Sequence, residues 1–194
     1  MMGVLFFKNM KIKIKSKKIK GKFLHCDFLE NKNTEKLVVL LSGLSGSKDL
    51  PLFGTASSAF FKNGFSTLRL NFCNDPDNKH QVVDTPDISD ANFEFYSAEL
   101  KNILEFFKKK YTNIVIIGHS FGAPIAIMFL SMYKSYAPRA QLILWDPSLL
   151  PFDKKAMDSA FEFDLAQKLY REKESKHPYT FNKKFYKELS EDMH

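Results

Sequence analysis

Short apolar segments of strand length alternate along this chain with segments in which apolar residues recur every three or four positions. The strand-length segments are bounded by polar or turn-forming residues and lie at 37–41, 65–71, 113–117 and 141–145. Uninterrupted apolar runs such as the first are typical of strands that helices cover on both faces. The helical spacing predicts helices at 56–62, 93–107 and 121–133. Strands that alternate with helices predict an α/β fold with a mostly parallel, doubly covered sheet.

The N-terminal part follows a two-residue period, in which lysine alternates with isoleucine over residues 10–15. Together with residues 19–28, this pattern predicts an antiparallel β-hairpin ahead of the parallel strands. Much of the net charge of +7 lies in residues 11–22. A basic run can mark a nucleic-acid or anionic membrane surface, but lysines also protect an edge strand from pairing with other chains. No aromatic stacking platform or nucleic-acid motif accompanies the run, so we expect no nucleic-acid partner.

The chain changes character after residue 150, and no further apolar strand is predicted there. Residues 151–190 combine charges, helical spacing and several phenylalanines, for example at 161–170. We therefore predict a core domain at 1–150 that is followed by a helical cap or lid segment at 151–194.

Composition predicts a globular protein of one domain and excludes several functional classes. The chain has 194 residues, of which 44% are hydrophobic and 26% charged, which is typical of a soluble domain with a substantial core. No apolar run is long enough to span a bilayer, so we expect no integral membrane segment. Cys26 and Cys73 do not form a disulfide framework, which favours a reducing, cytoplasmic setting. No Cys/His spacing resembles a zinc site, and we expect neither a metal nor a cofactor.

A serine flanked by glycines gives the strongest indication of chemistry. The pentapeptide Gly-His-Ser-Phe-Gly at 118–122 follows a predicted strand and precedes a helical run at 123–130. A sharp turn between a strand and a helix pushes a serine hydroxyl out of the sheet. The N-terminus of the following helix then favours the negative charge that develops there. Ser120 is therefore a candidate nucleophile, and the alternative is a serine that only caps the helix.

The pentapeptide and two other segments resemble the α/β-hydrolase superfamily, near the monoacylglycerol-lipase and serine-aminopeptidase-like esterases. The segment Leu-Ser-Gly-Leu-Ser-Gly-Ser-Lys at 41–48 occupies the place of the family's His-Gly-x-x-Gly loop, with Ser42 where histidine is usual. The segment at 64–72 resembles the family's fourth strand and its lead-in. The resemblance covers residues 11–147 and implies the α/β-hydrolase fold.

The resemblance also implies a role for individual residues. Ser120 corresponds to the family's nucleophile, and the backbone N–H groups of Leu44 and Phe121 correspond to its oxyanion hole. Acyl transfer needs these parts, because it requires an activated hydroxyl and two donors aimed at the developing oxyanion. A simple turn is the alternative explanation for Gly43 and Gly46. The expected function is hydrolysis of a carboxylic ester, with a small-molecule acyl ester as the substrate.

The histidine and the acid that would complete such a site are harder to assign. The family's order is serine, then an acid after a late strand, then a histidine after the last strand. The chain has histidines at 25, 80, 119, 177 and 194. The candidates are Asp146, which ends the strand at 141–145, and His177. An Asp-Pro turn and a solvated cap histidine are the alternative explanations for these two residues.

Two interpretations follow from these assignments. In the first, the chain is truncated before the last two strands and is a weak or inactive hydrolase that binds a ligand or pairs with another chain. In the second, it is a complete short enzyme that uses Asp146 and His177. The first interpretation leaves the apolar strand at 141–145 as an uncharged sheet edge, so self-association through that strand is expected.

Overall fold

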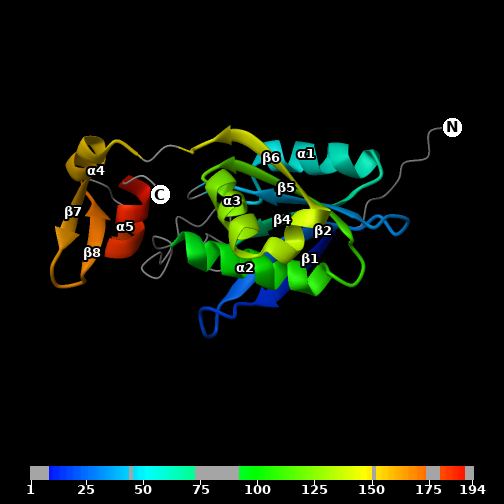
Figure 1. Cartoon of the computed structure of the whole chain (residues 1–194), viewed down its shortest axis with the longest axis horizontal. Helices are drawn as coiled ribbons and strands as arrows, with labels where there is room; N and C mark the ends of the chain where they lie inside the picture. Colours follow the sequence, from blue (N-terminus) through cyan, green and yellow to red (C-terminus); the bar gives the residue numbers. More distant parts are fainter. Residues whose placement is uncertain (1–8, 44–45, 73–91, 150–151, 174–179, 191–194) are drawn as a thin grey trace.

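The computed structural model describes residues 9–43, 46–72, 92–149, 152–173 and 180–190 (Figure 1). Within these residues, a main sheet has the strand order β1-β2-β4-β3-β5-β6, and a smaller sheet has the order β7-β8-β9. The strands are β1 (Asn9–Lys15), β2 (Phe23–Leu29), β3 (Lys36–Leu41), β4 (Ser66–Asn71), β5 (Asn113–Ser120), β6 (Ala140–Pro147), β7 (Phe161–Asp164), β8 (Leu169–Glu172) and β9 (Thr180–Asn182). The helices are α1 (Pro51–Lys62), α2 (Phe93–Phe107), α3 (Gly122–Met132), α4 (Lys154–Ala160), α5 (Lys183–Ser190) and the 3-10 helix η1 (Lys134–Arg139).

The main sheet is mostly parallel, as the alternation of strands and helices predicted. β4, β3, β5 and β6 pair in parallel, whereas the hairpin of β1 and β2 joins the edge of β4 in antiparallel fashion. The carboxyl ends of the parallel strands therefore meet at one end of the sheet, which is where open α/β sheets bind their ligands.

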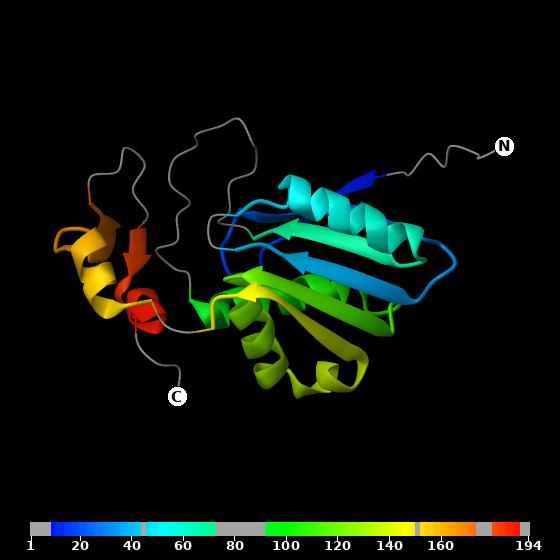
Figure 2. The ribbon, with the colours of Figure 1, turned by 90° about the horizontal axis from the view of Figure 1, so that it is seen from above.

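Helices cover both faces of the main sheet (Figure 2). α1 packs on β3 and β4, where Phe53 joins a small core with Val38, Leu40 and Ile117. α2 and α3 pack on the other face over a larger, phenylalanine-rich core. α1 begins earlier than predicted because Pro51 suits the first turn of a helix, where no N–H donor is needed. No helix in the described part of the chain is long and apolar enough to cross a membrane.

Buried hydrogen bonds fix the N-terminal hairpin on α2. The Ser16 hydroxyl donates to Glu99 Oε1 at 2.7 Å and accepts the backbone N–H of Lys18 at 3.0 Å. Asn102 Nδ2 donates to the carbonyl oxygen of Lys15 at 3.0 Å. Burial raises the pKa of the Glu99 carboxyl above its usual value, although the bonds from Ser16 and Lys18 oppose this. The turn between β1 and β2 consequently has a defined place against α2.

The C-terminal segment differs from the helical cap predicted for 151–194. It contains α4, the antiparallel strands β7, β8 and β9, and α5. The prediction of a helical pattern over 161–170 is wrong, and β7 lies there instead. Phe161 and Phe163 alternate with acidic residues in the two-residue period of a strand. Asp164 Oδ1 accepts two N–H groups of the following turn, which returns the chain into β8.

α5 attaches the C-terminal segment to the main core. The Phe185 ring lies 6.0 Å from that of Phe93 and 5.6 Å from that of Phe121, measured between centroids. Glu188 Oε2 accepts the backbone N–H of Phe93 at 2.9 Å, at the start of α2. The division into two domains at residue 150 stays a prediction, and α5 contributes its buried face to the same core as α2 and α3.

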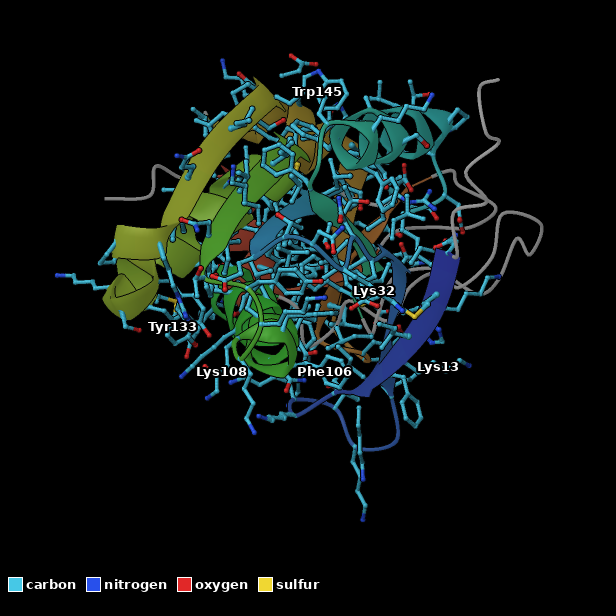
Figure 3. The ribbon with its side chains drawn as sticks, turned by 90° about the vertical axis from the view of Figure 1, so that its right-hand side faces the viewer. Lys13, Lys32, Phe106, Lys108, Tyr133 and Trp145 are labelled. Atoms are coloured by element: carbon cyan, nitrogen blue, oxygen red, sulfur yellow. The ribbon has the colours of Figure 1, made fainter. Side chains whose placement is uncertain are left out.

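β6 is the last strand of the main sheet, and no described strand pairs with its outer edge. Ile143 and Leu144 are 43% and 38% exposed, and no charged residue interrupts 140–145. The strand at the other edge, β1, carries exposed lysines at 11, 13 and 15; Figure 3 labels Lys13 on it and Trp145 on β6. The two edges therefore differ in their protection against pairing with another chain.

We predict that the chain self-associates through the β6 edge, and that Ile143→Lys weakens this association by about tenfold or more. A lysine in the middle of the strand would place charge where two apolar edges meet. Size-exclusion chromatography with light scattering over a range of concentrations measures the effect. Leu165→Lys is the matched control, because Leu165 is 81% exposed in the turn after β7. A parent chain that stays monomeric at all concentrations contradicts the prediction.

Candidate functional site

Ser120 ends β5, and only Phe121 separates it from the start of α3 at Gly122. Its backbone φ is 51°, in the left-handed region that residues with a Cβ atom rarely adopt. The pairing of β5 with β6 also shifts between His119 and Ser120. Strain of this kind persists only where the surrounding structure imposes it, and it clusters at functional sites. The expected order of strand, sharp turn and helix is present at this serine.

Three glycines allow the backbone to crowd around Ser120. A Cβ atom at Gly118 would lie 2.5 Å from the carbonyl oxygen of Gly122, and one at Gly122 would lie 2.6 Å from that of Leu41. A Cβ atom at Gly43 would lie 3.3 Å from Ser120 Oγ. The end of β5 and the start of α3 therefore pack directly on each other, and the backbone after β3 lies against the serine hydroxyl.

Ser148 contacts Ser120 through both its backbone and its side chain. The two hydroxyl oxygens lie 3.2 Å apart, and the N–H of Ser148 donates to the carbonyl oxygen of Ser120, also at 3.2 Å. Ser148 was not among the site residues predicted from the sequence. Its position directly after β6 could have indicated that it lies near Ser120, because neighbouring parallel strands bring their carboxyl ends together.

Phe121 has a buried side chain that anchors the turn. Its ring stacks on Phe93 at 5.1 Å between centroids and meets Tyr96 edge-on at 5.9 Å. This packing fixes the backbone of the residue whose N–H is a predicted oxyanion donor. Leu44, the other predicted donor, lies outside the described residues, so the pairing of the two donors stays a prediction.

An ion-pair network anchors the far end of the loop that follows β3. Lys48 is buried, and its backbone N–H donates to Asn71 Oδ1 at 2.6 Å. Arg69 Nη1 donates to the carbonyl oxygen of Lys48 at 2.9 Å, while its Nη2 donates to Asp27 Oδ2 at 3.0 Å. These bonds from β2 and β4 hold the end of the loop close to the sheet.

No described histidine forms a hydrogen bond with the Ser120 hydroxyl, although the buried Nδ1 of His119 has no hydrogen-bond partner and would lie 3.8 Å from a Cβ atom at Gly43. The His119 ring packs between Phe53 and Trp145, at centroid distances of 5.9 and 5.8 Å on the α1 side of the sheet. His25 lies on β2, opposite Lys13. The candidate base His177 lies outside the described residues, as do the histidines at 80 and 194.

Asp146, the candidate acid, is exposed near the end of β6 and has a φ of 44°. Aspartate tolerates the left-handed region better than most residues, as in turns. It precedes Pro147 and lies two residues before Ser148, so the structure brings it to the same end of the sheet as Ser120. Whether it acts as the acid stays a prediction. Among the described residues, no group of three or more His, Cys, Asp or Glu side chains could hold a metal ion.

Ser148→Ala is expected to slow covalent labelling of Ser120 by about three- to tenfold, the value of one lost hydrogen bond. The contact with the Ser148 hydroxyl favours one orientation of the Ser120 hydroxyl, and alanine at position 148 removes that contact. The rate of labelling by a fluorophosphonate measures the effect. Ser159→Ala is the control, since its hydroxyl bonds to the backbone of exposed α4. An unchanged rate in Ser148→Ala would show that the contact does not orient the serine.

Solved structures resemble this chain over most of its length. A hydrolase from Agrobacterium vitis has a TM-score of 0.65 and 14% identity, and the match covers 94% of this chain and 71% of that one. A serine hydrolase homologue from Coxiella burnetii has a TM-score of 0.57 and 19% identity, with 75% and 66% covered. An esterase from Pyrococcus furiosus has a TM-score of 0.51 and 22% identity, with 66% and 48% covered.

The chain therefore spans about half the length of the Pyrococcus furiosus esterase and less than two thirds of several such structures. No protein-family model and no curated protein matches the sequence. The three structures named above are each less than 25% identical to this chain, so their likeness concerns the fold.

Proposed function

Because the chain has the α/β-hydrolase fold, we propose that it is a serine hydrolase that cleaves a carboxylic ester with Ser120 as its nucleophile. The observation that carries the proposal is the strained φ of 51° at Ser120, between β5 and α3. A serine that only caps a helix has an extended backbone and needs no such strain. The approach of Gly43 to the hydroxyl supports the same role, because substrate and oxyanion need an open backbone there.

In the proposed reaction, Ser120 Oγ attacks the ester carbonyl carbon while a base takes its proton. The carbonyl oxygen becomes an oxyanion, which the N–H groups of Phe121 and Leu44 stabilise. Collapse of this intermediate breaks the ester C–O bond, the alcohol leaves with a proton, and an acyl-serine remains. Water then attacks the acyl-serine, which releases the carboxylic acid and restores the hydroxyl.

Exposed apolar side chains in the segment after β6 support an acyl ester as the substrate. Leu149 is 44% exposed and Phe152 is 43% exposed, and both follow the serine whose hydroxyl contacts Ser120. An exposed leucine directly after Ser148 favours an apolar chain on the ester. We therefore propose a neutral small-molecule ester with an apolar acyl group.

The presence or absence of a base that accepts the Ser120 proton distinguishes an active ester hydrolase from a second candidate function. His177 and Asp146 are the proposed base and acid. The alternative is a weak or inactive hydrolase that binds a ligand or pairs with another chain. Two observations favour it: no described histidine forms a hydrogen bond with the Ser120 hydroxyl, and no described strand pairs with the outer edge of β6.

Turnover of p-nitrophenyl acetate, butyrate and octanoate by the purified chain tests the proposal, together with labelling by a fluorophosphonate. Turnover that rises with acyl length and stops after labelling supports the ester hydrolase. Labelling without turnover supports the weak hydrolase. A chain that neither reacts with the fluorophosphonate nor hydrolyses the esters contradicts both the nucleophile and the reaction.

A further inference from the structure

The turn of the N-terminal hairpin lies at the same end of the main sheet as Ser120. In the register, His25 near the start of β2 pairs with Asn71 at the carboxyl end of β4, and Leu41 at the end of β3 pairs with Gly118 of β5. Residues 16–22, which join β1 to β2, therefore lie beside the carboxyl ends of the parallel strands. Figures 1 and 2 show this turn at the end of the sheet from which β5 leads into α3.

The hairpin has a dense positive charge along β1 and in its turn. Seven lysines between residues 11 and 22 have exposed side chains, and none forms an ion pair with another described residue: Lys11, Lys13, Lys15, Lys17, Lys18, Lys20 and Lys22. No acidic residue occurs in the sequence before Asp27. Glu99, which accepts the backbone N–H of Lys18, and Asp27, which pairs with Lys11 across the hairpin, offset part of this charge, and the lysines outnumber them.

Protection of a sheet edge explains only part of this charge. The lysines at 11, 13 and 15 lie on the edge strand β1, where they oppose pairing with another chain. The lysines at 17, 18, 20 and 22 lie in the turn, which offers no strand edge to protect. This turn is well structured, because the Ser16 hydroxyl accepts the N–H of Ile19 at 2.8 Å and the Ser16 N–H donates to the carbonyl of Lys22.

Exposed apolar side chains accompany the lysines at this end of the molecule. Phe23 follows the turn directly, is 42% exposed and pairs across the hairpin with Lys15. Leu50 and Leu52, at the start of α1, are also exposed, and so are Leu149 and Phe152 after β6. α1 follows the carboxyl end of β3, so Leu50 and Leu52 come from the same end of the sheet as Phe23, whereas β6 lies four strand positions from β2. Cationic and apolar side chains together are what an interfacial surface presents to lipid.

We propose that the hairpin turn and Phe23 bind the surface of an anionic phospholipid bilayer, which brings the end of the sheet with Ser120 close to the lipid. The lysines attract the anionic headgroups, and Phe23 enters the apolar boundary beneath them. Binding depends only on the hairpin, whereas the use of the bilayer as a source of ester rests on the proposed function. A bilayer fits better than a nucleic acid because apolar side chains rather than a stacking platform flank the protruding turn.

The test is co-sedimentation of the full chain with vesicles of phosphatidylcholine, with and without phosphatidylserine, at equal total lipid. The chain is expected to bind the mixed vesicles far better than the neutral ones, and added salt weakens the binding. The variant K17Q/K18Q/K20Q/K22Q is expected to lower the partition coefficient by about a hundredfold or more. Phe23→Ser is expected to reduce binding further at high salt, where charge contributes least.

The matched control removes four exposed lysines elsewhere, in the variant K62Q/K109Q/K134Q/K168Q. Equal loss of binding in both quadruple variants would mean that only the net charge matters, and it would overturn the proposal. Absence of binding to the mixed vesicles would also overturn the proposal. The same holds if a single-stranded oligonucleotide competes with the vesicles and binds the chain more tightly than they do. The same measurement on Ser120→Ala separates the outcomes, because a failed hydrolase still binds vesicles if the proposal is right.

Discussion

Replacing Ser120 by alanine is expected to abolish fluorophosphonate labelling and to lower ester turnover by about a thousandfold or more. Alanine removes the oxygen atom that would carry the acyl group, while the backbone donors and the substrate contacts remain. Labelling is followed by intact-protein mass, and turnover by release of p-nitrophenol. Ser159→Ala, on exposed α4, provides a serine-to-alanine control that is expected to change neither measurement. Labelling that persists in Ser120→Ala would show that another residue is the nucleophile.

Two further variants then identify the proton acceptor. Turnover that falls by a similar factor in His177→Ala, and by less in Asp146→Asn, supports the complete short enzyme. Turnover that is lost in Ser120→Ala but kept in His177→Ala points to a different base or to one from a partner chain. A third outcome is that the parent chain turns over the ester only weakly, at a rate that neither His177→Ala nor Asp146→Asn lowers. This result supports a hydrolase without its own base, since the oxyanion donors alone retain some catalysis.

The second large effect concerns stability, and Gly122→Ala is expected to destabilise the fold by about 3 kcal/mol. A Cβ atom at Gly122 would lie 2.6 Å from the carbonyl oxygen of Leu41 and 2.8 Å from that of Ser42. Both atoms belong to backbone, so the start of α3 would have to move away from the end of β3. The midpoint and slope of urea unfolding, followed by circular dichroism, give the change in the free energy of unfolding.

Gly54→Ala is the matched control for this stability measurement. Gly54 lies inside α1, and the nearest atom to an added Cβ is Arg69 Nη1 at 3.7 Å, an ordinary contact. Alanine there is expected to stabilise the chain by about 0.5–1 kcal/mol, since glycine is a poor helix former. Equal unfolding midpoints for the two variants would show that α3 and β3 are not packed as tightly as the structure has them.

The sequence by itself determined the elements of the main sheet and the turn at Ser120. Periods of two and of three to four residues are local, so they located the hairpin, the parallel strands and α2 within a few residues. Glycines on both sides of the serine predicted a crowded turn, and the backbone strain at Ser120 agrees with that pattern. Local patterns failed at 161–170, where two short strands pair only because the turn after Asp164 brings them together.

Only the tertiary structure decided which distant residues meet. Ser148 and Ser120 are 28 positions apart, and their hydroxyls come within 3.2 Å because β5 and β6 run in parallel and end together. The lysines of the hairpin turn reach the same end of the molecule because β2 runs antiparallel to β4. Strand order and register depend on packing across the whole sheet, and no local period in the sequence encodes them.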